Sequence, residues 1–195
     1  NSLLAGRIHA SVPAFVFVFA LNVPAALAVY NRYTKEPFDE VNHFRCDTEQ
    51  LNAAGDVMCS GGLILEADSN ISTKWARSGR QSMVSSNRFP YTLQHGFDDM
   101  NGGDLIEIEL WKKGEGISLV LLGENNTCDK IYIANNKSDY TGKDGWEHIH
   151  MVYKVPEACR NIRLHFLIHN PGGTIVYIDD LHFITKKTVA IKNQL

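Results

Sequence analysis

The chain has 195 residues, of which 44% are hydrophobic and 21% are charged, and its formal net charge at pH 7 is −3. This length suits one globular domain with an appendage. The charge balance argues against a nucleic-acid-binding protein, which normally carries a basic excess or stripe. The β-branched and aromatic residues are numerous enough to form a core, so the composition also excludes a disordered chain.

The N-terminal part contains a long uncharged stretch. Residues 10–30 are 21 residues without a charge, and at about 1.5 Å per residue a helix of this length is long enough to cross a hydrocarbon core about 30 Å thick. Pro24 is expected to bend it, because proline lacks an amide donor and clashes with the preceding turn. Three interpretations stay open: a signal peptide cleaved after Ala28, an uncleaved membrane anchor, and a buried helix of a soluble protein. We favour the anchor, which places the rest of the chain in the periplasm, a lumen or the extracellular space, as a signal peptide also does.

The expected organisation has four parts. They are a transmembrane anchor over residues 1–30, a polar tether over 31–40, a β-sandwich over 41–185 and a basic tail over 186–195.

Four cysteines indicate an oxidising compartment. They are Cys46, Cys59, Cys128 and Cys159, and the absence of a C-x-x-C spacing argues against a zinc ribbon. Four cysteines allow three pairings, of which we expect the pairing local in sequence, Cys46–Cys59 and Cys128–Cys159. Four buried free thiols are the alternative.

Three N-x-S/T triplets begin at Asn70, Asn125 and Asn136. Such triplets are acceptors for N-linked glycans only in a glycosylating cell, and they also arise often by chance.

Beyond the tether, turn residues separate short runs rich in β-branched and aromatic residues, which is typical of strands. The run from Leu105 to Trp111 alternates apolar and polar side chains with a period of two, which indicates a half-buried strand. Residues 68–80 lack such periodicity and are expected to form a long loop. No amphipathic helix of normal length is predicted after residue 40, so we expect an all-β sandwich or barrel. The expected strands cover residues 43–47, 63–67, 81–86, 91–96, 105–111, 117–122, 130–134, 146–153, 161–169 and 174–183.

The second half of the chain resembles a known family. An alternating strand ends in Trp111-Lys112-Lys113, Gly145-Trp146 opens another, Val155-Pro156 closes that one, and residues 173–181 read GTIVYIDDL. This order resembles the C-terminal half of galactose-binding-like jelly rolls, which include the carbohydrate-binding modules attached to glycoside hydrolases, and residues 77–82 resemble the family's S-G-x-x-S segment. The resemblance covers residues 41–184 and implies a two-sheet antiparallel jelly-roll sandwich, here preceded by one transmembrane helix. Because the family uses this sandwich for glycan binding, protein contacts and structural spacing, the resemblance does not decide the function.

The resemblance also implies a structural calcium ion between the first and last strands. The matching positions are Asp47 or Glu49 near the start and Asp180 near the end, with a carbonyl near Ser78, and carboxylate and carbonyl oxygens are what calcium prefers. The alternative is that Asp179 and Asp180 cap a turn or pair with a lysine.

Sugar binding requires exposed aromatic rings for stacking and polar side chains for hydroxyl groups. The aromatic candidates are Trp75, Tyr91, Trp111, Tyr132, Tyr140 and Trp146, although Trp146 is expected to fill the core. If the three expected strands over residues 105–111, 146–153 and 161–169 lie in one sheet, its outer face is unusually polar and forms a ligand groove; an ordinary solvated face is the alternative. The candidate ligand-binding residues are Trp75, Glu107, Glu109, Trp111, His148, His150, Arg163 and His165.

Two functions are predicted, and neither is catalytic. His148 and His150 point the same way on a strand, but no third ligand for a transition metal is evident. The motifs of common hydrolases and nucleotide-binding proteins are also absent.

Asn22 and the two prolines of residues 10–30 are better tolerated beside protein than in lipid, so we expect an accessory subunit of a larger membrane protein complex. The alternative is a membrane-tethered carbohydrate-binding module that recognises envelope or extracellular glycans.

Overall fold

The computed structural model describes residues 38–67, 70–125, 128–142 and 144–188. The predicted anchor over residues 10–30 lies outside these ranges. Within them, no helix is both long enough and apolar enough to span a membrane.

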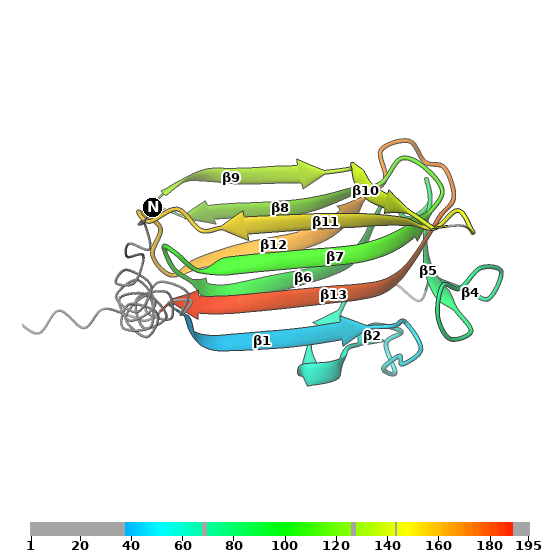
Figure 1. Ribbon diagram of the computed structural model, residues 1–195, viewed down its shortest axis with the longest axis horizontal. Helices are drawn as coiled ribbons and strands as arrows, with labels where there is room; N and C mark the ends of the chain where they lie inside the picture. Colours follow the sequence, from blue (N-terminus) through cyan, green and yellow to red (C-terminus); the bar gives the residue numbers. More distant parts are fainter. Residues whose placement is uncertain (1–37, 68–69, 126–127, 143, 189–195) are drawn as a thin grey trace, which may run out of the picture. The chain divides into compact units, whose positions relative to one another are not determined.

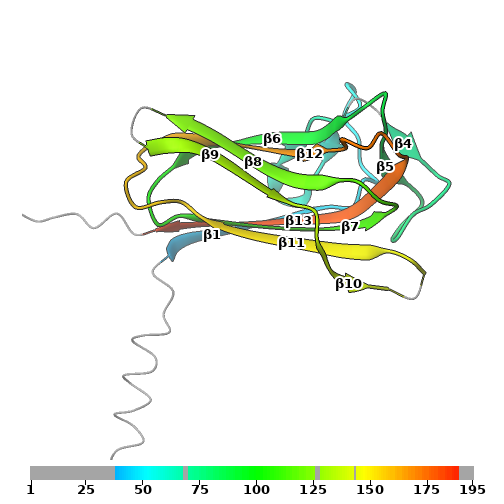
Figure 2. The same ribbon diagram turned by 90° about the horizontal axis from the view of Figure 1, so that it is seen from above.

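The described residues form two packed antiparallel sheets (Figures 1 and 2) and a small two-stranded sheet of β2 and β3. In the seven-stranded sheet the order is β10-β11-β7-β13-β5-β4, and β1 also pairs with β13. The four-stranded sheet has the order β6-β12-β8-β9. The prediction of an all-β, two-sheet antiparallel sandwich is therefore confirmed. The strands are β1 (Phe38–Cys46), β2 (Val57–Met58), β3 (Ile64–Leu65), β4 (Ile71–Ser72), β5 (Ser82–Ser85), β6 (Tyr91–Met100), β7 (Leu105–Lys113), β8 (Ser118–Asn125), β9 (Cys128–Asn135), β10 (Ser138–Thr141), β11 (Glu147–Lys154), β12 (Ile162–His169) and β13 (Val176–Thr188), with a short 3-10 helix, η1 (Ser60–Gly62).

The core lies between the two sheets and follows from the alternation of the strands. In β7 the side chains of Ile106, Ile108 and Leu110 are buried, and the side chains between them face outward. The same pattern in β12 directs Leu164 and Phe166 toward the other sheet, where Phe166 packs edge-on against Phe183 of β13 at a ring-centroid distance of 4.9 Å. Full burial of one such side chain stabilises the fold by about 1.5–3 kcal/mol.

One condition of the predicted ligand groove is not met. The strands β7 and β11 pair with each other, but β12 lies in the four-stranded sheet. Outward residues of β12 therefore lie on the opposite side of the sandwich from those of β7 and β11. Period-two alternation separates the two faces of one strand and carries no information about which sheet the strand joins.

Several strand boundaries also differ from the expected ones. The first strand, β1, begins at Phe38, inside the segment assigned to the tether, and β13 continues to Thr188 because β1 and β7 pair along it. The expected loop over 68–80 contains the short strand β4, and neither β2 nor β10 is predicted. All three missed strands, β2, β4 and β10, are too short for a periodic pattern.

Both disulfides have the predicted pairing. Cys46 at the end of β1 is bonded to Cys59, with Cα atoms 4.3 Å apart, and Cys128 at the start of β9 is bonded to Cys159, with Cα atoms 5.0 Å apart. Two disulfides in one domain of this size indicate an oxidising, extracytoplasmic compartment.

Candidate functional site

The outer face of the seven-stranded sheet carries a row of paired acids and histidines, here called the histidine–carboxylate row. Asp139 Oδ1 lies 2.7 Å from His148 Nδ1, and the other nitrogen of His148 lies 3.4 Å from Glu109. Glu109 also lies 2.9 Å from His182 Nδ1, and His182 Nε2 lies 3.4 Å from His43. The row therefore crosses five neighbouring strands, β10, β11, β7, β13 and β1.

A second pair lies beside this row, with Glu107 Oε1 at 2.8 Å from His150 Nε2. The structure thus brings together Glu107, Glu109, His148 and His150, as the alternation of β7 and β11 predicts. Their polar atoms are paired with one another, however, and a ligand would have to displace these contacts. His43, His182 and Asp139 are missed by the sequence analysis, because strand pairing brings them there.

The two tryptophans on this side are already covered by cations of the same chain. The guanidinium carbon of Arg77 lies 3.8 Å from the ring centroid of Trp111, and the ammonium of Lys113 lies 4.3 Å from that of Trp75. Each cation is attracted to the negative face of its ring. One face of each of these two rings is therefore covered and cannot stack on a sugar. The third tryptophan, Trp146, is buried as expected.

The carboxylates predicted to hold calcium are bonded to protein donors. Asp180 forms an ion pair with Arg77 and accepts a hydrogen bond from the Ser78 hydroxyl. The Glu49 carboxylate accepts hydrogen bonds from the backbone N–H groups of Arg80 and Gln81. The Asp47 carboxylate accepts one from the N–H of Glu49.

These residues do not fit the ion well, because Arg77 already supplies the positive charge beside Asp180. Among the described residues, no three His, Cys, Asp or Glu side chains are grouped so that they could hold a metal ion. The calcium site stays a prediction.

The outer face of the four-stranded sheet is different, because it combines exposed tyrosines with an apolar centre. We call this surface the tyrosine face; its residues are Tyr91, Gln94, Val120, Tyr132, Arg163, His165, Leu167 and His169.

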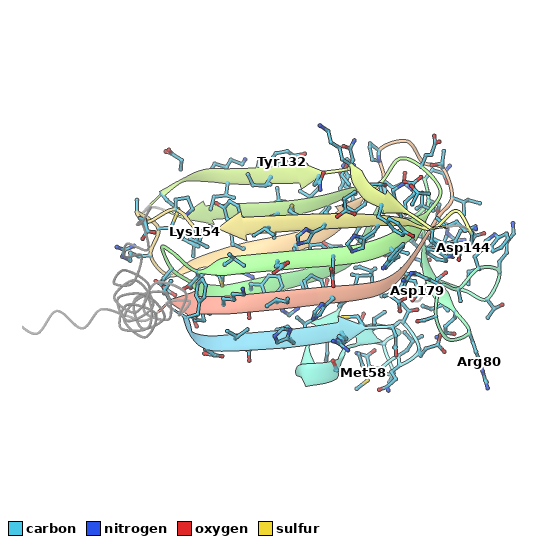
Figure 3. All side chains as sticks on the ribbon, in the orientation of Figure 1. Met58, Arg80, Tyr132, Asp144, Lys154 and Asp179 are labelled. Atoms are coloured by element: carbon cyan, nitrogen blue, oxygen red, sulfur yellow. A yellow bond between two sulfur atoms is a disulfide. The ribbon has the colours of Figure 1, made fainter. Side chains whose placement is uncertain are left out.

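The two tyrosines lie at opposite edges of this sheet. Tyr132 lies on β9 (Figure 3) and is 62% exposed. No other described ring stacks on it. Tyr91 on β6 is 51% exposed and stacks on His169 of β12, with ring centroids 4.8 Å apart and planes 8° apart. His169 therefore covers one face of the Tyr91 ring, and the rest of the ring is accessible.

The strands between the tyrosines supply an apolar centre. Val120 of β8 pairs with Leu167 of β12, and their neighbours along each strand point into the core, so these two side chains face away from it. They are nevertheless only 3% and 8% exposed. The side chains around them therefore cover them closely.

Polar groups lie at one end of the tyrosine face. His165 Nε2 lies 3.2 Å from Gln94 Oε1, and Arg163 pairs with Asp98 at 3.4 Å. The guanidinium of Arg163 lies over Gly96, where an added Cβ would come within 2.4 Å of it. Glycine at this position therefore permits Arg163 to lie flat on the sheet. Of the predicted ligand-binding residues, only Arg163 and His165 belong to this face.

An open hollow lies at the edge of the sandwich between β9 and the end of β11. Ile131, Ile133 and Tyr153 line it with Pro156 and Ala158. Burial raises the pKa of the Tyr153 hydroxyl, so this phenol is neutral at pH 7.

Comparison with known proteins supports the fold. No protein-family model matches the chain, and no curated protein is significantly similar in sequence. The structure is similar to the tandem of two family 22 carbohydrate-binding modules of Xyn10C from Paenibacillus barcinonensis, with a TM-score of 0.50 and 14% identity over 83% of this chain and 49% of that chain. The first module of that protein, a xylan-binding domain, gives a TM-score of 0.48 and 15% identity over 74% of this chain and 94% of that chain. The C-terminal family 22 module of Clostridium thermocellum Xyn10B gives 0.46 and 14% over 78% and 96%.

At these identities the likeness concerns the fold alone. The described part of the chain is a β-sandwich that resembles carbohydrate-binding modules.

Proposed function

We propose that the protein binds glycans, without catalysis, on the tyrosine face. The observation that carries this proposal is the pair of exposed rings, Tyr91 and Tyr132, on one outer face together with Gln94, Arg163 and His165. The C–H faces of sugar rings stack on aromatic rings, while amide, imidazole and guanidinium groups form hydrogen bonds with hydroxyl groups.

The spacing of the tyrosines supports an oligosaccharide as the ligand. Tyr91 is on β6 and Tyr132 is on β9, which are the two edge strands of a four-stranded sheet. Three strand spacings separate them by at least about 14 Å. A ligand that contacts both rings must therefore be longer than a single sugar.

The histidine–carboxylate row is the weaker candidate. Its acids and imidazoles pair with one another, and the rings of Trp75 and Trp111 hold Lys113 and Arg77. A sugar bound there would have to replace these contacts, whereas on the tyrosine face it adds contacts to rings that have none on their exposed side.

An accessory role in a membrane complex is the function first expected from residues 10–30. No observation on the described residues favours it over glycan binding. The fold supports the binding proposal, since the tandem with which it is shared consists of carbohydrate-binding modules, although a fold alone does not imply a function.

The proposal is tested by isothermal titration calorimetry of the full chain with neutral β-linked oligosaccharides, including xylo- and galacto-oligosaccharides of increasing length. We expect affinity to rise from the disaccharide to longer ligands. The variant Tyr132→Ala is expected to bind about 5- to 12-fold more weakly, because it removes about 1–1.5 kcal/mol of stacking.

Tyr140→Ala is the matched control, because Tyr140 is 59% exposed on β10 of the other sheet. It is expected to bind as the unmodified chain does. Equal losses in both variants, or no binding to any oligosaccharide of the panel, would contradict the proposal.

A further inference from the structure

The three N-x-S/T triplets are not equivalent in the folded chain. The Asn70 side-chain amide nitrogen is buried and has no hydrogen-bond partner among the described residues. Its backbone is also held, since Asn70 N–H donates to Ala67 and its carbonyl accepts from Val84. A glycan on this nitrogen has no room in the native structure.

Asn136 lies in the opposite environment. It is exposed in the two-residue connection between β9 and β10, where the chain passes from one sheet to the other. The preceding residue, Asn135, fixes this connection: its amide nitrogen donates to the carbonyl of His150 at 2.8 Å, and its oxygen accepts the N–H of Lys137 at 3.0 Å. The connection is thus held by the Asn135 side chain, while the Asn136 side chain is exposed.

We propose that Asn136 is an N-glycan attachment site in a cell that glycosylates, and that Asn70 carries no glycan in the native protein. In this modification the Asn136 amide nitrogen forms a bond to the anomeric carbon of an oligosaccharide. The donor is a polyprenyl-pyrophosphate-linked oligosaccharide, whose bond between that carbon and the pyrophosphate oxygen breaks. The amide loses one proton and the polyprenyl pyrophosphate leaves.

The compartment supports this assignment independently of the triplet. The two disulfides indicate an oxidising, extracytoplasmic environment, which is where such donors act. The Ser138 hydroxyl, which completes the triplet, donates to Glu147 at 2.6 Å in the folded state. We therefore place transfer before β10 pairs with β11; the fold then accommodates a glycan on the exposed Asn136 but not on the buried Asn70 nitrogen.

The position of Asn136 also gives the glycan a physical role. It lies between β9 and β10, which are edge strands of the two sheets. All four residues of β10 are exposed, and β9 also carries exposed apolar residues. An unpaired edge is a template for pairing with another chain, and a bulky, hydrated glycan beside both edges hinders that pairing.

The test is expression of the full chain through the secretory pathway of a eukaryotic cell, in an Asn125→Gln background that removes the third triplet. Mass spectrometry of peptides from the protein that reaches the cell surface or the medium, before and after enzymatic removal of N-glycans, reads the occupancy of each site. We expect a glycan on the peptide that contains Asn136 and none on the peptide that contains Asn70.

Asn136→Gln and Ser138→Ala are each expected to abolish the mass shift, whereas Asn70→Gln is expected to leave it unchanged. Glycan on Asn70 is expected only in protein retained inside the cell, which is recovered by lysis and read in the same way. Protein at the cell surface or in the medium with an unmodified Asn136, or with a glycan on Asn70, would overturn the inference. Because glycan occupancy is read by mass spectrometry and does not depend on binding of free oligosaccharides, failure of this inference would leave the glycan-binding proposal as it stands.

Discussion

The Asp179 carboxylate is buried where the closing strand bends. It accepts the backbone N–H groups of Arg77 and Ser78 at 2.8 and 3.2 Å and that of Asp180 at 2.8 Å. Asp180 has a φ of 48°, a left-handed backbone conformation, and the register of β13 shifts there. Burial raises the pKa of the Asp179 carboxyl from its ordinary value near 3.8 to about 6, and the nearby charge of Asp180 adds to this effect against the lowering by the three N–H donors.

This raised pKa predicts that stability falls as the pH rises from about 4 to about 6. In that window the folded state binds more protons at Asp179 than the unfolded state, so deprotonation favours unfolding. At neutral pH, deprotonation of Asp179 therefore lowers the free energy of unfolding by about 3 kcal/mol. Urea unfolding at several pH values should show a steeper fall for the unmodified chain than for Asp179→Asn, which cannot titrate. Parallel pH profiles for the two proteins would contradict this role of Asp179.

The strands differ in how much of their role was predictable from sequence. Alternation in β7 and β12 correctly predicts which side chains enter the core, because the period of two is a local property of a strand. The assignment of β12 to the opposite sheet is decided by long-range pairing with β6 and β8. For this reason Arg163 and His165 were grouped with Glu107 and His150, from which the whole sandwich separates them. Tyr91 and Tyr132 were recognised as aromatic candidates, but their shared face depends on the same pairing.

The core contribution of β12 can be measured at Phe166, which is fully buried against Phe183. Phe166→Ala is expected to lower the free energy of unfolding by about 3–5 kcal/mol, because it removes buried apolar surface and leaves a cavity. Urea denaturation measures this loss. Val152→Ala on the exposed face of β11 is the control and is expected to change stability by less than about 0.5 kcal/mol. A loss below about 1 kcal/mol for Phe166→Ala would mean that β12 does not pack as described.

The packing of the two sheets gives the sandwich two outer faces of different chemistry. On one, acids pair with histidines across β10, β11, β7, β13 and β1, and cations cover two tryptophan rings. On the other, Tyr91 and Tyr132 stand at the edges of an apolar centre formed by Val120 and Leu167. A surface whose polar groups are already paired contributes to stability, whereas exposed rings beside polar side chains are available to a ligand.

The most direct measurement of this difference is a titration of the isotopically labelled chain with its best-bound oligosaccharide, followed by backbone amide chemical shifts. Glycan binding on the tyrosine face predicts that the largest shifts occur at Gln94, Tyr132 and His165, while Glu109 and His182 on the other sheet stay unchanged. Shifts concentrated at Glu109 and His182, with the tyrosine face unaffected, would contradict the proposed site.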